Sequence, residues 1–316
     1  MGRGTTLPTL AIVVSAVLWG VWWMPIRRLD QSGVTGDWAS LLLFALASAA
    51  LVPVAVARRR TLAAHAPVLA AVGLFMGGAM VAWNHALITG EVVRATLLFY
   101  LAPLWATGLA LVVLKERVSP VRAVSIPLGL AGAAVLLGFE DGFPLPRSVS
   151  DVMAVMSGVS FALGATFARK AQDVGVAEKI VVTMFGGAVA AILLATMLAT
   201  PPPSRAEVAA ALPLFASVTL LWWIPLFWLI LWAATRLEPG RVAVLLLLEI
   251  VVAAVTATWL AGEPFGWREG LGMVLIVGAG LVDTLGDRWR VGPRGAAASL
   301  SLNGPRESPD ENRRRS

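Results

Sequence analysis

The chain has 316 residues, of which 58% are hydrophobic and only 14% are charged, and its formal net charge is +6. Soluble domains are about a quarter charged, so this composition excludes an ordinary soluble protein and indicates an integral membrane protein. The absence of cysteine excludes disulfides, thiolate catalysis and metal sites built from cysteine.

Apolar segments follow one another along most of the chain. A membrane-spanning helix needs about 20 mostly apolar residues, and stretches rich in charge, glycine and proline separate the segments here. The first segment has a weakly charged start and no A-x-A site, so we interpret it as a retained helix, not a cleaved signal. We expect an all-α integral membrane fold with ten transmembrane helices, at residues 7–26, 37–57, 66–88, 93–114, 119–138, 151–169, 179–199, 209–234, 241–261 and 267–286.

Tryptophan is unusually frequent, with 13 residues against one tyrosine. Trp22 and Trp23 fall near the end of the first helix, as expected for an aromatic belt at the membrane interface. Trp19 in the first helix and Trp223 in the eighth lie deeper. A deep tryptophan can stack on a cationic or aromatic solute, although its simpler role is packing, so both residues are candidates for lining a cavity.

The third helix carries the polar pair Asn84 and His85 near its end. Histidine titrates near neutral pH, which makes the pair a candidate for contact with a solute. Because adjacent residues point in different directions on a helix, only one of them can face the bundle centre, and we favour His85. The alternative is that they are ordinary interfacial groups.

The fourth helix begins with Glu91 and Arg94, whose spacing of three favours a local ion pair at the interface; the alternative is a gate or an anion contact at the mouth. Thr96, Tyr100 and Thr107 then recur at helical spacing on one stripe. This stripe can hydrogen-bond a solute in a cavity, or its threonines can bond back to their own helix while Tyr100 packs.

The ninth helix contains VLLLLEIVVAAV, residues 244–255, with one carboxylate, Glu249. Glu249 follows Arg241 by eight residues, which is about 12 Å along a helix and near the middle of the membrane. An ionisable group at that depth is a functional-site candidate, able to couple proton and substrate movement. The alternative is a structural carboxyl that bonds a neighbouring helix.

Lysine and arginine concentrate in the loops that share a side with the N-terminus, which predicts that this side is cytoplasmic. An even number of helices then places the C-terminus in the cytoplasm as well, in a multi-pass protein of the cell (cytoplasmic) membrane. Residues 287–316 are basic and rich in proline, serine and glycine, so we expect a disordered cytoplasmic tail. No folded basic domain is evident, and no nucleic-acid partner is expected.

Two parts of the chain repeat one pattern. Residues 86–116 and 233–263 align with an offset of 147, which superposes the charged positions Glu91 on Glu238, Arg94 on Arg241 and Glu116 on Glu263. We therefore predict a first repeat at 1–142 and a second at 143–286, although apolar segments also resemble one another by chance. Since five helices is an odd number, the second repeat would be inverted, as in many secondary transporters.

Five stretches carry a resemblance to a known family: AVLWG in the first helix, LLFYLAPLWATGLALVVLKERVS in the fourth, LLLLEIVVAAVTATWLAGEPF in the ninth, and LGLAGAAVLL and LGMVLIVGAGLV in the fifth and tenth. Together they resemble the EamA-type ten-helix branch of the drug/metabolite transporter superfamily. The ninth helix departs from the family pattern, because Ile250 stands where proline usually follows the glutamate. The resemblance implies two inverted repeats around a substrate cavity and movement of small metabolites, often outward and often amino acids or related compounds.

We therefore expect a secondary transporter that moves a small amino-acid-like, neutral or aromatic solute by alternating access, in the export direction by resemblance, with protons as a candidate coupling ion. The sequence carries no enzymatic motif, so neither an enzymatic activity nor a cofactor is expected. A passive facilitator of the same fold, a membrane-embedded lipid-modifying enzyme and a non-transporting scaffold or receptor remain as alternatives, and the oligomeric state stays open. The predicted cavity and coupling residues are Trp19, Asn84, His85, Tyr100, Thr107, Trp223 and Glu249.

Overall fold

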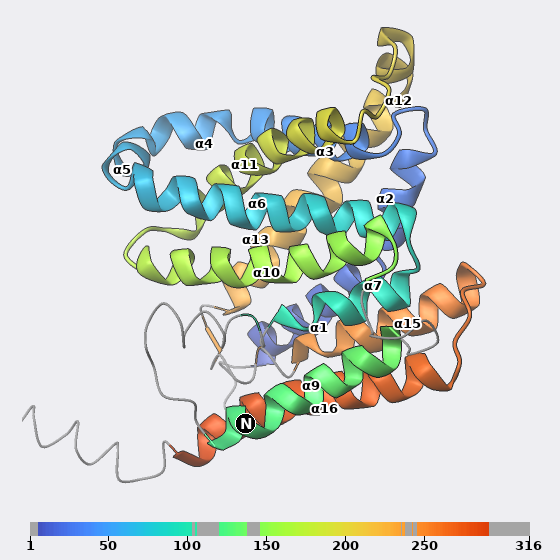
Figure 1. The fold of residues 1–316 in the computed structure, drawn as a ribbon. Helices are drawn as coiled ribbons and strands as arrows, with labels where there is room; N and C mark the ends of the chain where they lie inside the picture. The colour runs from blue at the N-terminus through green and yellow to red at the C-terminus, as the bar shows by residue number, and fades with distance from the viewer. Residues whose placement is uncertain are drawn as a thin grey trace, which may run out of the picture.

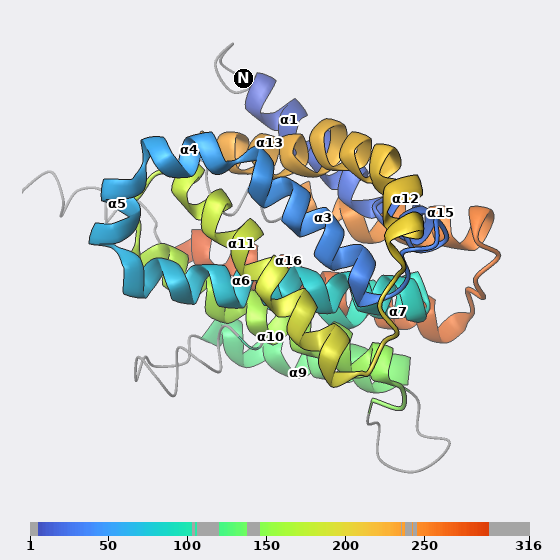
Figure 2. The ribbon, with the colours of Figure 1, turned by 90° about the horizontal axis from the view of Figure 1, so that it is seen from above.

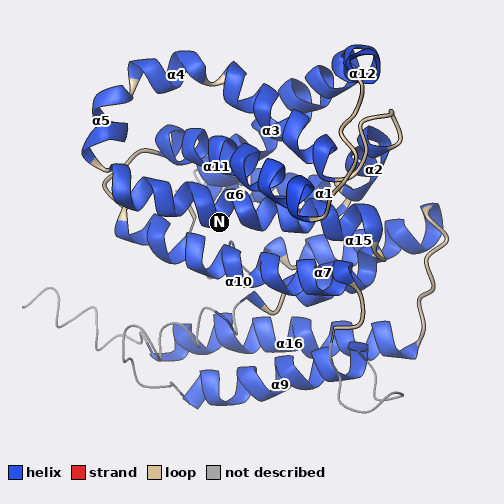
Figure 3. Ribbon diagram, turned by 45° about the horizontal axis from the view of Figure 1, so that its top comes forward, coloured by secondary structure: helices blue, strands red, loops and turns tan. Residues whose placement is uncertain are grey.

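The computed structural model describes residues 6–102, 105, 120–137, 146–234, 236–237, 242 and 245–290. In these residues it contains helices and turns and no strand (Figure 3), so the all-helical prediction is confirmed there. The helices are α1 (Thr6–Gly20), α2 (Trp23–Asp30), α3 (Asp37–Ala50), α4 (Val52–Ala57), α5 (Arg59–Ala64), α6 (Ala66–Thr89), α7 (Val92–Phe99), α9 (Pro120–Leu137), α10 (Val149–Lys170), α11 (Val176–Met197), α12 (Arg205–Val218), the π-helical turn Thr219–Trp223, α13 (Ile224–Ala234), α15 (Leu248–Leu260) and α16 (Trp267–Arg290).

Every range predicted to span the membrane contains a described helix, in whole or in part. Five helical segments are long and apolar enough to cross a bilayer: Thr6–Asp30, Ala66–Thr89, Val149–Lys170, Val176–Met197 and Arg205–Ile230. Shorter apolar helices occupy Asp37–Ala50, Val124–Leu136 and Leu248–Leu260. The predicted ranges 93–114 and 241–261 are described only in part.

Local sequence explains several helix boundaries. The turn between α2 and α3 contains Gly33 and Gly36 with φ of 99° and 60°, a backbone region that glycine enters without steric cost. The side chain of Ser204 accepts from the Glu207 backbone N–H and the Glu207 side chain accepts from the Ser204 N–H, a capping box that begins α12. These signals stand between apolar runs and divide them into separate helices.

The long helices lie side by side and run in one general direction across Figure 1. The turns at 31–36, 90–91, 198–204 and 261–266 lie at one end of the molecule, called here the α2 end, and α5 and the turn 171–175 lie at the other, the α5 end (Figure 1). The α6 group consists of α6, α7 and α10, which pack on one another, and the α1 group consists of α13 and α15, which pack on α1, together with α1 and α2. Helix α2 continues the α1 segment along the chain and itself packs on α6. Figure 2 shows α1 and α13 on one flank and α10 on the other.

Contacts between the first and second halves of the chain come in related pairs. Helix α6 packs on α10, and α13 packs on α1; α7 packs on α10, and α15 packs on α1. Helix α9 packs on α16 in opposite directions, because Gly132 faces Ile276 while Leu136 lies beside Gly272 and Leu128 beside Gly278. Exchanging the two halves therefore reproduces these helix contacts.

Small residues bring α6 and α11 close together. A Cβ atom on Gly77 would meet the backbone of Gly186 and Gly187, and one on Gly73 would meet the carbonyl of Val182. Such contacts let helix backbones approach closely in membranes, where apolar burial against lipid gives little drive for association.

Candidate functional site

The buried carboxylate of Glu249 has a specific partner. The hydroxyl of Tyr100, at the end of α7, donates to Oε2 of Glu249 on α15 at 2.7 Å and lies 3.1 Å from the carbonyl oxygen of Leu246. Glu249 is 7% exposed. The bond joins the α6 group to the α1 group, so it can report or control their relative position.

An aromatic cluster lies where α1 meets the π-helical turn. Trp223 is fully buried and contacts Trp19, Trp22, Phe44 and Phe227, with ring centroids between 4.4 and 5.6 Å apart. A π-helical turn inserts an extra residue into a helix and often occurs at functional sites.

Hydrogen-bond donors in the aromatic cluster are available to a ligand. The indole N–H groups of Trp19 and Trp223 and the hydroxyl of Thr219 are buried and lack a hydrogen-bond partner among the described residues. Buried polar groups are normally paired. The cluster can therefore offer donors to a solute that carries hydrogen-bond acceptors.

Asn84 and His85 are both buried and both bond side chains of α3, but Asn84 alone also bonds Trp22. The indole N–H of Trp22 donates to Oδ1 of Asn84 at 2.9 Å, and the Asn84 amide donates to the Ser40 hydroxyl at 3.3 Å. Nδ1 of His85 lies 3.0 Å from Oδ1 of Asp37 on α3. Asn84, rather than the favoured His85, thus connects to the aromatic cluster.

At the α2 end, one arginine side chain joins three segments of the chain. Nε of Arg27 donates to the carbonyl of Leu87 at 2.8 Å, and Nη2 donates to the carbonyl of Gly90 at 2.7 Å and to Oε1 of Glu263 at 2.9 Å. Oε2 of Glu263 accepts from the backbone N–H of Val93 at 3.3 Å. The Arg27–Glu263 pair therefore holds the turn between α6 and α7.

A second arginine binds a carboxylate at the same end. Nε and Nη2 of Arg94 contact the two carboxylate oxygens of Asp151 at 2.7 and 2.9 Å, and Nη1 donates to the carbonyl of Leu136 at 2.8 Å. The predicted pair between Arg94 and Glu91 is wrong as the main contact, because Asp151 offers a bidentate acceptor from α10.

Five of the seven predicted residues fall into two connected sets, and His85, which bonds Asp37, belongs to neither. Tyr100 bonds Glu249, while Trp19, Trp223 and, through Trp22, Asn84 share the aromatic cluster. Gly20 links the sets, since a Cβ there would meet the backbone oxygen of Glu249. Thr107 lies outside the described residues, as does the repeat-related pair of Glu238 and Arg241.

Sequence reasoning missed Asp37, Asp151 and Arg27 and placed Trp22 in the interfacial belt. Trp22 is instead fully buried, because it packs on Trp223 and its indole N–H bonds Asn84. The motif Ser148-x-x-Asp151 at a helix start was the available signal for Asp151, since Ser148 accepts from its backbone N–H at 3.0 Å.

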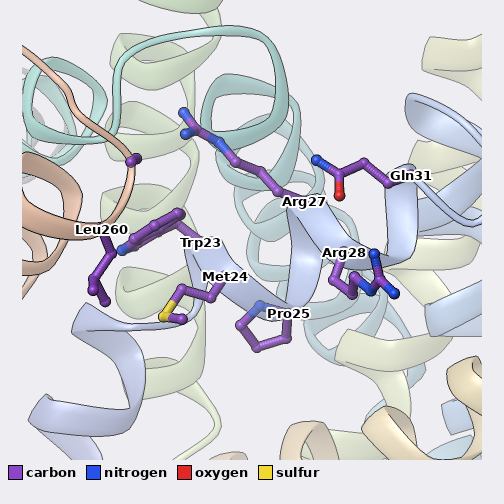
Figure 4. A pocket seen from close by; sticks show the side chains of 8 residues that line it. Trp23, Met24, Pro25, Arg27, Arg28, Gln31 and Leu260 are labelled. Carbon is purple, nitrogen blue, oxygen red and sulfur yellow. The ribbon is translucent and has the colours of Figure 1, made fainter.

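A surface pocket of about 590 Å³ opens beside α2 (Figure 4), and none of the predicted cavity residues lines it. The side chains of Arg27 and Arg28 point away from each other there (Figure 4). Arg27 is already engaged by Glu263 and by backbone carbonyls. Among the described residues no group of histidine and carboxylate side chains could hold a metal ion.

A protein-family model identifies the family to which this chain belongs. The model of the EamA-like transporter family matches the chain twice, over residues 6–138 and 148–282. The chain belongs to the EamA-like transporter family. It is thus a multi-pass membrane protein and a transporter of the drug/metabolite type, as its sequence signatures indicated.

A solved structure entitled "Crystal structure of protein" has a TM-score of 0.56 to this EamA-like transporter, with 18% identity over 90% of this chain and 99% of that chain. At this identity the likeness shows a shared fold only. A search of curated protein sequences gives no significant match. The two family matches fall on the two halves whose helix contacts are related by exchange, which supports a two-repeat architecture.

Proposed function

We propose that this EamA-like transporter is a secondary transporter with ten spanning helices in two inverted repeats, at 1–142 and 143–286, followed by a cytoplasmic tail. The antiparallel packing of α9 on α16 supports inversion. Two contacts support inversion as well. Val93 pairs with Glu263, and Tyr100, seven residues later, pairs with the earlier residue Glu249, so α7 and the ninth helical segment are antiparallel. Alternating access follows as movement of the α6 group against the α1 group.

The Tyr100–Glu249 bond carries the proposal for the site. This bond joins the α6 group to the α1 group in the membrane interior, beside the aromatic cluster. Separation of the two groups would break the bond and leave the Glu249 carboxylate and the Tyr100 phenol free to bind a solute. Unpaired indole N–H groups and aromatic faces nearby suit a small neutral, amino-acid-like or aromatic metabolite. Glu249 is the candidate group for proton coupling.

The transporter is proposed to act in the cell membrane in the export direction, with both termini in the cytoplasm. The test is a comparison of extracellular metabolites from cells that produce the wild type or Glu249→Gln at equal membrane levels. We expect a metabolite class enriched outside only with the wild type. Equal enrichment with both proteins would reduce Glu249 to a structural role, and enrichment with neither would contradict export.

Proton coupling needs a separate measurement. In proteoliposomes, the exported metabolite should accumulate against its gradient when a pH gradient is imposed, and Glu249→Gln should abolish the response to that gradient. Transport that only equalises the concentrations, with or without the pH gradient, would identify a passive facilitator instead.

A further inference from the structure

We propose that the Arg27–Glu263 pair is a reversible closure of the α2 end, an inference that rests on the alternating-access function proposed above. Both residues belong to the α1 group or its connecting turn, whereas the backbone groups they bind belong to the turn between α6 and α7. The pair therefore acts across the boundary between the two groups of helices, at the end of the molecule rather than in its interior.

The α6–α7 turn presents the groups that such a pair requires. Leu87 and Gly90 lie at the C-terminus of α6, where the last carbonyls have no partner within the helix, and Val93 lies in the first turn of α7, where N–H groups are similarly free. Arg27 supplies donors to the carbonyls and Glu263 supplies the acceptor for the N–H. One ion pair thus satisfies both helix ends at once.

The geometry allows these bonds to break without separating the charges. The 2.9 Å contact between Arg27 and Glu263 lies inside the α1 group, so both side chains keep their partner when the α6–α7 turn moves away. The Arg27 side chain is 23% exposed, which gives water access to the groups released. Burying a charge without a partner is costly. Because Arg27 and Glu263 stay paired, neither charge is left alone whether the α6–α7 turn is bound or has moved away.

Neighbouring side chains on α2 and α15 also hold the pair in place. The guanidinium of Arg27 lies 5.3 Å from the centre of the Trp23 ring, a cation–π distance. The indole N–H of Trp23 donates to the hydroxyl of Thr256 on α15 at 3.0 Å. Neither contact involves the α6–α7 turn, so both remain when that turn moves away.

Thr96 provides a reporter for the closure. It lies on α7 between Val93 and Tyr100, is 1% exposed, and its hydroxyl has no partner among the described residues. Because the chain contains no cysteine, Thr96→Cys introduces a single thiol of similar size behind the closure.

The experiment measures the rate at which a membrane-impermeant methanethiosulfonate modifies Thr96→Cys from each side of oriented membrane vesicles. We expect slow modification from the α2 end, and at least tenfold faster modification when Arg27→Gln or Glu263→Gln is added. Arg28→Gln is the matched control, since Arg28 is exposed and has no hydrogen bond or ion pair within the described structure; its rate should equal that of Thr96→Cys alone. Monodisperse elution in detergent confirms that each variant is folded.

Equal rates in the parent, Arg27→Gln and Glu263→Gln, whether slow or fast, would overturn the closure. Acceleration by Arg28→Gln as well would overturn it too, because loss of any nearby charge would then suffice. The assay needs no substrate, so its result is independent of transport. Faster labelling in a protein that exports nothing would keep the closure and reject the proposed export, while unchanged labelling in an active exporter would reject only the closure.

Discussion

Tyr100 and Glu249 are 149 residues apart in the chain, yet the hydroxyl of one donates to the carboxylate of the other at 2.7 Å. Replacing the phenol by phenyl tests what this bond contributes. The ring of Tyr100 also meets Phe99 edge to face, with centroids 5.5 Å apart, and Tyr100→Phe keeps that packing while leaving the buried carboxylate of Glu249 without its donor.

We expect Tyr100→Phe to lower the free energy of unfolding by about 1–3 kcal/mol, the cost of buried groups left unpaired. Glu249→Gln should cost less, because an amide oxygen still accepts the bond. Thermal unfolding in detergent measures both, and the double variant should lose less than the sum of the two. Additive losses would show that the two side chains do not stabilise each other.

Adjacent glycines in α6 give a matched pair of variants. A Cβ on Gly77 would meet the backbone of α11, whereas a Cβ on Gly78 meets nothing within 4 Å. We expect Gly77→Ala to destabilise the protein by about 1–3 kcal/mol through overpacking, and Gly78→Ala to be neutral or to stabilise it by up to about 1 kcal/mol through helix propensity. Similar melting temperatures for the two variants would contradict the close packing of α6 on α11.

The helices were largely predictable, because their apolar runs are long and turn residues separate them. Contacts between helices were less so. Glu249 and Tyr100 each stood out as polar groups in apolar surroundings. Helical periodicity, however, assigns a residue to one face of its helix and does not identify the helix that packs against that face. The partners of Arg27 at Leu87 and Gly90 are backbone carbonyls, which leave no trace in a side-chain pattern.

The Arg94 contact shows how tertiary structure overrides a local spacing. Glu91 lies three residues from Arg94, and such a spacing contributes a few tenths of a kcal/mol in an isolated helix. Asp151 is preordered by the backbone N–H of Arg147, which donates at 3.1 Å, and it meets the guanidinium with both oxygens. Two charge-assisted bonds in a buried site outcompete one exposed local pair.

Arg94→Lys tests that geometry while keeping the charge. Lysine presents a point charge instead of a planar fork, so it cannot serve both oxygens of Asp151 and the carbonyl of Leu136 together. We expect a loss of about 1–3 kcal/mol in the free energy of unfolding. Arg28→Lys, at an exposed arginine, should leave the melting temperature unchanged, and equal effects of the two substitutions would contradict a specific role for the Arg94 fork.

Glu91, at the start of α7, predicts a pH effect. Partial burial raises the pKa of the Glu91 carboxyl above its usual range, and the negative charge of Glu263 raises this pKa further. A carboxyl whose pKa is higher in the folded state binds more protons there than when unfolded, so its contribution to stability falls as pH rises through that window. Glutamine is neutral at every pH. We therefore expect Glu91→Gln to melt at a higher temperature than the wild type at pH 7.5, and the difference to shrink as the pH falls towards 5. Melting curves of both proteins across this range provide the measurement. A wild type that is the more stable at pH 7.5, or a difference that does not change with pH, would show that ionised Glu91 is not destabilised where it lies.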